Sequence, residues 1–120
     1  MSTIKKSGNN LSLELSVFVF KDTDYPNGDM YIAYCPELDL SGYDVTSVKA
    51  RKSFEFVLKD YLDYTTENGT LEEDLMKHGW RKYKNGRIVE PTYASMLRNS
   101  QLKNVLGKSK FSKYSMPVLL

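Results

Sequence analysis

The stretch YCPELDLSGYDVTSVKA, residues 34–50, changes character three times, and these changes decide the fold. Its apolar start ends at Pro36, which lacks the amide proton that a β-ladder needs, so a strand is expected to stop near Cys35. A third strand can begin after the Pro-Glu step and cover residues 38–43. Thr46 is a good N-cap, which predicts that a helix begins directly behind it.

Two strands are predicted before this stretch. Residues 11–20, LSLELSVFVF, alternate apolar and polar side chains at first with a period of two. Residues 30–35, MYIAYC, are apolar on both faces, as in a strand at the centre of a sheet. The Pro-Asn-Gly turn between the two runs predicts an antiparallel hairpin with a generous loop.

Helical patterns follow the same stretch. Apolar residues recur at helical spacing behind the cap threonine, which predicts one amphipathic helix on one face of the sheet. Thr70 and Glu73 have the spacing of a capping box and predict a short second helix. Residues 80–91, which contain an Asn-Gly turn, are expected to add a strand or a small ribbon, and residues 93–107 are weakly helical.

The order strand, strand, strand, helix predicts an α+β fold. We expect an antiparallel sheet of three to four strands covered by one main helix, with a second short helix. Residues 1–10 are expected to be a flexible N-terminus, residues 11–91 the α+β domain, and residues 92–120 a basic C-terminal extension. One helix covers one face of a small sheet, and self-association would cover the other.

The composition fits one globular domain, with 41% hydrophobic and 27% charged residues in a chain of 120. No stretch approaches the roughly 20 apolar residues of a membrane span, and the polar start lacks the apolar part of a secretory signal. A cytoplasmic protein without a membrane partner is therefore expected. Cys35 and His78 are the only residues of their types, so an intrachain disulfide and a Cys/His zinc site are excluded within one chain. No cofactor is expected.

The net charge of +2 conceals a strong asymmetry along the chain. Residues 1–80 have a charge balance of −6, and residues 81–120 have a balance of +8 with Glu90 as their only acid. This pattern indicates a basic segment that meets nucleic acid, an acidic partner or the acidic part of the same chain. A solvated tail whose apolar residues pack on the body explains the pattern as well. The nucleic-acid-binding candidates alternate with apolar and aromatic residues: Arg98, Lys103, Lys108, Lys110 and Lys113.

Residues 31–62 resemble the core of the HicB-type antitoxins of bacterial and archaeal toxin–antitoxin pairs. The similarity extends over residues 11–120 and includes FSKY and MPVLL near the C-terminal end. Asp44 and Val45 depart from the pattern, because the family has a second glycine and an acidic or polar residue there, and Lys49 replaces an acid of the capping box. The matching residues are Tyr31, Ala33, Tyr34, Pro36, Glu37, Leu38, Gly42, Tyr43, Thr46 and Ala50.

The resemblance implies a partial ribonuclease-H-like fold without its catalytic apparatus. It also implies a partner, a small HicA-type toxin that cleaves messenger RNA and whose RNA-binding face the antitoxin covers. A symmetric dimer or paired dimers are expected as well. Binding of the operon's own operator DNA is an open hypothesis, because no helix-turn-helix or ribbon-helix-helix segment is evident. The candidates for the toxin interface are acids and tyrosines near turns and loops: Asp22, Asp24, Asp29, Tyr31, Glu37, Asp39, Tyr43 and Asp44.

Two other classes of function stay open. A metal-dependent nuclease needs several carboxylates that converge on two metal ions. The candidate acids have no spacing that forces convergence, so we expect no enzymatic activity: Glu14, Asp29, Glu37 and Asp39. The other alternative is a stand-alone nucleic-acid-binding regulator, or a structural dimer, that has no toxin partner.

Overall fold

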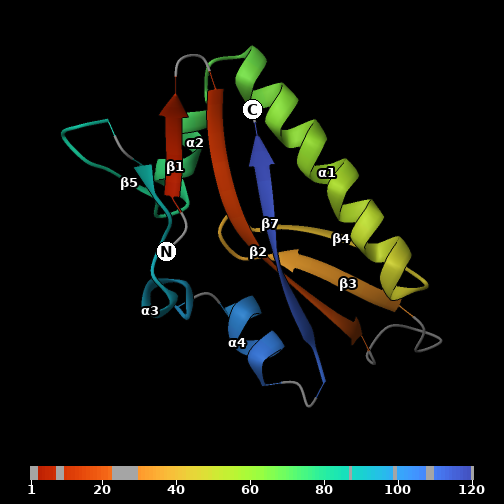
Figure 1. Cartoon of the computed structure of the whole chain (residues 1–120). Coiled ribbons are helices and arrows are strands. Elements are labelled where there is room, and N and C mark those ends of the chain that lie inside the picture. Colours follow the sequence, from red (N-terminus) through yellow and green to blue (C-terminus); the bar gives the residue numbers. More distant parts are fainter. Residues whose placement is uncertain are drawn as a thin grey trace.

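The structure, a computed structural model, describes residues 3–7, 10–22, 30–86, 88–98, 100–107 and 110–119. Strands and helices follow one another as shown in Figure 1. Their bounds are β1 Thr3–Ser7, β2 Asn10–Asp22, β3 Met30–Cys35, β4 Leu40–Asp44, α1 Ser47–Glu67, α2 Leu71–Lys77, β5 Arg81–Lys82, β6 Ile88–Val89, α3 Tyr93–Met96, α4 Ser100–Leu106 and β7 Ser112–Leu119. None of the helices in these ranges combines the length and the apolar character that crossing a bilayer requires.

The long strand β2 organises the sheet. β3 pairs with its C-terminal half and β1 with its first residues, whereas β7 pairs with it from Ser12 to Val19. The residues of β2 that pair with β7 include residues that also pair with β1 and with β3. A strand has only two edges, so β7 lies along the opposite edge of β2 from β1 and β3. β4 continues the sheet beyond β3, β6 and β5 continue it beyond β1, and every pairing is antiparallel.

This architecture confirms the predicted α+β class, with an antiparallel sheet packed against one long helix, α1. The predicted hairpin is β2–β3. The third predicted strand is β4, which begins at Leu40 because residues 36–39 form a turn in which Asp39 has a φ of 53°. The ribbon expected in residues 80–91 is the pair β5–β6.

Two segments that the sequence placed outside the α+β domain contribute strands to its sheet. Thr3–Ser7, in the N-terminus expected to be flexible, forms β1 and pairs with β2 and β6. Ser112–Leu119, in the expected basic extension, forms β7 along β2. Every second residue of β7, namely Tyr114, Met116 and Val118, packs against the core. The basic segment therefore folds back onto the body of the protein.

One face of the sheet is covered by α1 and α2. Leu15, Val17 and Val19 of β2 point to this face, because they alternate along the strand. They pack against residues that recur at helical spacing in α1 and α2: Ala50, Phe54, Leu58, Leu62, Leu71 and Leu75. This cluster is the main core of the protein.

The N-termini of the two helices differ. Thr46 caps α1 as predicted, because its Oγ1 accepts a hydrogen bond of 3.1 Å from the backbone amide of Lys49. Thr70 makes no side-chain capping bond, so the predicted capping box is wrong although the helix is present. The amide of Thr70 instead donates to the carbonyl of Thr65 at 2.8 Å, which joins α2 directly to the end of α1.

The helix α1 approaches β4 most closely at Gly42. A β-carbon at this position would lie 2.6 Å from the Cα of Phe54, nearer than two such atoms can approach. Gly42 is required by this contact between strand and helix.

The opposite face of the sheet is partly covered by α3 and α4. Phe18 and Phe20 point to this face because they alternate with the residues of the main core. They pack with Tyr34 of β3 and with three residues of the short helices: Met96, Leu102 and Val105. The face that self-association was expected to cover is thus shielded here by the chain itself.

Candidate functional site

The residues predicted for a toxin interface separate into two regions. The register of β2, β3 and β4 brings Asp22, Tyr31 and Asp44 to one end of the sheet, with Tyr31 directly opposite Asp44. Glu37 and Asp39 lie in the turn at the other end of β3 and β4. Two further candidates lie outside the described residues: Asp24 and Asp29.

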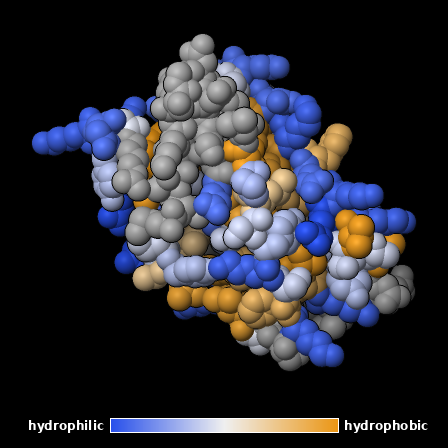
Figure 2. Space-filling view, in the orientation of Figure 1, coloured by the Kyte–Doolittle hydropathy of each residue, from blue (hydrophilic) through white to orange (hydrophobic). Residues whose placement is uncertain are grey.

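Three exposed apolar residues flank Asp44 in the sequence, where β4 leads into α1. Tyr43, Val45 and Val48 are 62%, 55% and 59% exposed, and with Asp44 they are referred to below as the β4 edge surface. The amide of Tyr43 donates to Oγ of Ser53 at 3.3 Å, and the amide of Val45 donates to Oδ1 of Asp44 at 2.6 Å. The backbone amides are thus occupied, while the side chains face outward. Figure 2 shows hydrophobic side chains exposed on the right, near the start of α1.

Glu37 is buried, although it lies in a turn, with only 2% of its surface exposed. Its two carboxylate oxygens accept hydrogen bonds from the backbone amide of Ser16, at 3.2 and 3.1 Å. The thiol of Cys35 donates to its Oε1 at 3.5 Å. Burial is the main cause that raises the pKa of the Glu37 carboxyl above its usual value. Glu37 is therefore not available as a solvated interface acid.

Cys35 is fully buried beside this carboxyl. Burial, and then the nearby Glu37, raise the pKa of its thiol well above the usual value. The thiol stays protonated at neutral pH and is unsuited to nucleophilic chemistry.

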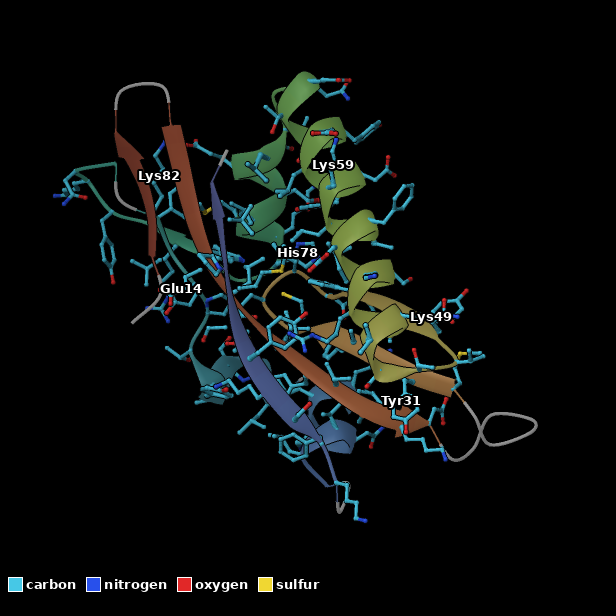
Figure 3. The ribbon with its side chains drawn as sticks, turned by 45° about the vertical axis from the view of Figure 1, so that its right-hand side comes forward. Glu14, Tyr31, Lys49, Lys59, His78 and Lys82 are labelled. Carbon is cyan, nitrogen blue, oxygen red and sulfur yellow. The ribbon has the colours of Figure 1, made fainter. Side chains whose placement is uncertain are left out.

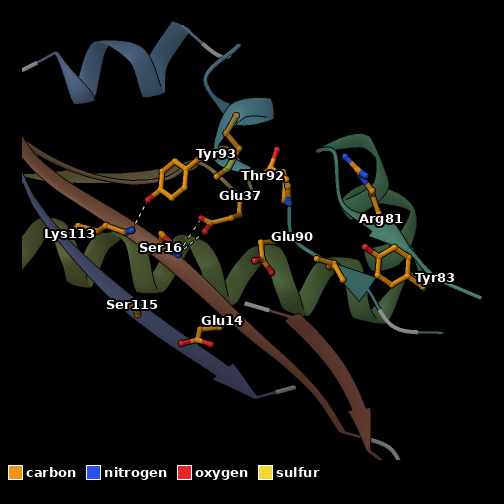
Figure 4. Close-up of a pocket in the computed structure, with 13 residues that line it drawn as sticks. Glu14, Ser16, Glu37, Arg81, Tyr83, Glu90, Thr92, Tyr93, Lys113 and Ser115 are labelled. Atoms are coloured by element: carbon orange, nitrogen blue, oxygen red, sulfur yellow. Dashed lines mark hydrogen bonds between the residues drawn. The ribbon is translucent and has the colours of Figure 1, made fainter. Parts of the chain in front are cut away.

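Glu37 lies at the edge of a cavity of about 620 Å³ on the second face of the sheet (Figure 4). Glu14 and Ser16 line this cavity from β2, Tyr93 and Met96 line it from α3, and Glu90 lines it from the residue after β6. The cavity is referred to below as the acidic cavity, after Glu14, Glu37 and Glu90. Oε2 of Glu90 is buried and makes no hydrogen bond with any of the residues that the structure describes.

Lys113 of β7 lines the acidic cavity as well and has its own partners. Its Nζ donates to the hydroxyl of Tyr93 at 2.6 Å and lies 5.7 Å from the centre of the Phe18 ring. Of the predicted candidates, Glu37 and Lys113 are thus brought to one cavity, although they were assigned to different partners. Among the described residues, no three His, Cys, Asp or Glu side chains form a group that could hold a metal ion.

The other nucleic-acid-binding candidates are spread over the C-terminal segments. Arg98, Lys103 and Lys110 are exposed, before α4, on α4 and before β7 respectively. Lys110 borders an open groove of about 640 Å³ together with Tyr31. One candidate lies outside the described residues: Lys108. Nucleic-acid binding by these residues stays a prediction.

The two candidate regions are far apart. Figure 3 labels Tyr31, which pairs with Asp44 of the β4 edge surface, and Glu14 of the acidic cavity, and they lie at opposite sides of the molecule. A ligand at one region does not occupy the other.

Comparison of the chain with protein-family models, with curated proteins and with solved structures gives no match. The resemblance to HicB-type antitoxins therefore stays a prediction.

Proposed function

We propose that this protein is a HicB-like antitoxin. In this proposal it binds a small HicA-type toxin through the β4 edge surface and covers the face with which the toxin binds RNA. Inhibition then needs no chemical step, because a bound protein excludes the RNA by occupying its place.

The exposure of Tyr43 is the observation that carries this proposal. Other residues of the resemblance have a role in the fold: Ala50 is fully buried, Gly42 allows α1 to approach β4, and Thr46 caps α1. Tyr43 is 62% exposed, so core packing does not explain it. Exposed tyrosines are typical anchors of protein interfaces, because a large rigid side chain is buried there at little cost in entropy.

The neighbours of Tyr43 support an interface at this place. Val45 and Val48, in the segment that follows Tyr43, add exposed apolar area, and Asp44 adds a negative charge to the same segment. A protein that binds RNA has a basic surface, and the balance of −6 in residues 1–80 would attract it. Such long-range attraction mainly speeds association, whereas the apolar contacts slow dissociation.

The proposal is tested by coexpression with the small basic protein encoded in the adjacent reading frame. The wild-type chain is expected to restore growth and to copurify with this protein. The double variant Tyr43→Ser, Val48→Ser is expected to lose the rescue and to bind at least about 30-fold more weakly, because an interface anchor contributes roughly 2 kcal/mol or more.

The matched control is Tyr64→Ser, which removes an equally exposed tyrosine near the other end of α1. It is expected to restore growth like the wild type. If the double variant binds as tightly as the wild type, the β4 edge surface is not the interface. If the two wild-type proteins do not associate at all, a stand-alone regulator or a structural dimer explains the chain better.

A further inference from the structure

We propose that the outer edge of β7 pairs with the same edge in a second copy of the chain, which joins the two sheets into one. This inference goes beyond the proposed function. The strands β2 and β3 separate β7 from β4, so the edge of β7 and the β4 edge surface do not overlap.

The strand β7 has a neighbour on one side only among the strands that the structure describes. It pairs with β2 over the 8 residues Ser112–Leu119. The backbone groups along its other edge therefore have no strand partner within the described chain. An edge strand of this length is a template on which another strand can form hydrogen bonds.

The direction of the backbone amide of Ser16 identifies the groups at this edge. This amide donates to the carboxylate of Glu37, in the turn after β3, so it points away from β7. Because backbone groups point alternately to the two edges of a strand, those of Leu15 point toward β7, where Met116 is the partner. The residues of β7 whose backbone groups face outward are therefore Lys113, Ser115 and Pro117.

The position of Pro117 agrees with this assignment. A proline has no amide proton, so within a sheet it is tolerated where its nitrogen faces away from the neighbouring strand. The outer edge thus has amide donors at Lys113 and Ser115, and carbonyl acceptors at these two residues and at Pro117.

The charge of Lys113 does not protect this edge, although lysines on edge strands commonly prevent pairing. Its Nζ donates to the hydroxyl of Tyr93 at 2.6 Å and lies 5.7 Å from the centre of the Phe18 ring. Figure 4 shows the side chain directed toward Tyr93. The ammonium group is therefore held over β2, on the side away from the outer edge of β7.

A second copy of β7 matches this edge in an antiparallel pair that has Ser115 on a two-fold axis. Ser115 exchanges hydrogen bonds with Ser115 of the second copy, and the amide of Lys113 donates to the carbonyl of Pro117 opposite. The outward amides of Lys113 and Ser115 in both copies are then used, and Pro117 serves only as an acceptor. The missing amide proton of Pro117 lies away from the axis, so the central pair is complete.

The side chains are compatible with this register. The two copies of Lys113 lie about 14 Å apart, beyond the screening length of about 8 Å at physiological ionic strength. Tyr114 lies opposite Met116 of the second copy, and contacts between sulfur and aromatic rings are favourable. Tyr114 and Met116 are only partly buried in one copy, because α1 lies mainly over β3 and β4. They therefore have apolar surface that the second copy can cover.

The test uses the purified full chain without any other protein, followed by sedimentation velocity over a range of concentrations. A concentration-dependent species of twice the chain mass of 13.8 kDa is expected. The decisive variant is Ser115→Pro, which removes an outward amide proton as Pro117 already does. It is expected to dimerise at least about tenfold more weakly, because the hydrogen bonds donated by both copies of Ser115 are lost.

The matched variant is Ser115→Ala, which keeps the amide proton and is expected to dimerise like the wild type. Thermal unfolding of dilute samples separates a loss of pairing from a folding defect. The midpoint of Ser115→Pro is expected to stay close to that of the wild-type monomer, because the nitrogen of residue 115 faces away from β2.

A second test uses disulfide formation and needs no proline. In Ser115→Cys the two thiols lie opposite each other on the axis, with Cα atoms about 5.5 Å apart, within the range of a disulfide. Oxidation with diamide is expected to give a covalent dimer, and Cys35 does not compete because it is buried. The control is Ser112→Cys on the same strand. Its thiols are about 20 Å apart in the dimer and are expected not to cross-link.

The proposal is overturned if the wild-type chain stays monomeric up to millimolar concentration, if folded Ser115→Pro dimerises like the wild type, or if Ser112→Cys cross-links as fast as Ser115→Cys. None of these measurements includes a toxin, and none of the variants alters the β4 edge surface. Failure here therefore leaves the proposed function standing, and failure of the coexpression test leaves this inference standing.

Discussion

The indole Nε1 of Trp80 donates a hydrogen bond of 2.8 Å to the carbonyl oxygen of Glu37, 43 residues earlier in the chain. Both residues are buried. The bond ties the segment after α2 to the turn between β3 and β4, and it holds Glu37 where its side chain reaches the acidic cavity. One contact thus connects the main core to the second face of the sheet.

Replacing Trp80 by phenylalanine is expected to destabilise the protein by about 2 kcal/mol, because the buried carbonyl of Glu37 loses its donor and part of the indole contact is lost. Urea unfolding followed by circular dichroism measures this change, since the variant lacks the only tryptophan of the chain. A change in the free energy of unfolding below about 0.5 kcal/mol, the level of a neutral surface substitution, would show that this hydrogen bond does not stabilise the fold.

Gly42→Ala is expected to destabilise the protein by about 3 kcal/mol or more, because the new methyl group would overlap the backbone of α1 at Phe54. Gly107→Ala is the matched control. There the nearest atom is the Lys103 carbonyl oxygen, at 3.4 Å, and the change is expected to be small. Chemical denaturation of both variants decides the question, and equal midpoints would contradict the close contact between β4 and α1.

Leu102→Ala is expected to destabilise the protein by about 3 kcal/mol, because Leu102 is fully buried against Phe18 and Phe20 and its removal leaves a cavity. Leu106→Ala, on the same helix but partly exposed, is expected to cost much less. Thermal unfolding compares the two variants. If they unfold alike, α4 does not cover the second face in solution.

Glu37 is expected to make stability depend on pH. Its pKa is raised in the folded state, so the folded protein keeps a proton that the unfolded chain has already lost above its pKa of about 4.5. Stability from this group is present below that pH and falls as the pH rises through the higher pKa of the folded state. Each unit by which the pKa is raised corresponds to about 1.4 kcal/mol.

Glu37→Gln removes this titration and keeps an oxygen that accepts the amide of Ser16. Urea midpoints measured from pH 4 upward are expected to fall less for the variant than for the wild type. Glu67→Gln, at the exposed end of α1, is expected to keep the wild-type profile. Parallel profiles of Glu37→Gln and the wild type would contradict a raised pKa at Glu37.

The order of the first strands and of α1 could be predicted because its signals are local. The period of two in residues 11–20, the missing amide proton of Pro36 and the cap at Thr46 act within a few positions of the chain. The pairing of β7 with β2 could not be predicted in this way, because its partners are remote in sequence and Pro117, which has no amide proton, argues against a strand.

The candidate sites were predicted less well than the fold. Tyr43 and Asp44 were identified by their position in a turn before a helix, and their side chains meet solvent. Glu37 was assigned to a solvated turn, because an acid after proline carries no local signal of burial. The acidic cavity depends on contacts among β2, β6 and β7, which are remote in sequence. In the sequence, Glu90 is distinguished only as the single acid of a basic segment, which does not predict its place in this cavity.

The pairing of Leu13 with Val118 spans nearly the whole described chain. During synthesis on the ribosome, one edge of β2 therefore has no neighbour until residues 112–119 have been made. Until then, the nascent polypeptide carries an unsatisfied β-edge and exposed apolar side chains. Such a chain is exposed to aggregation and to cellular proteases until β7 is added.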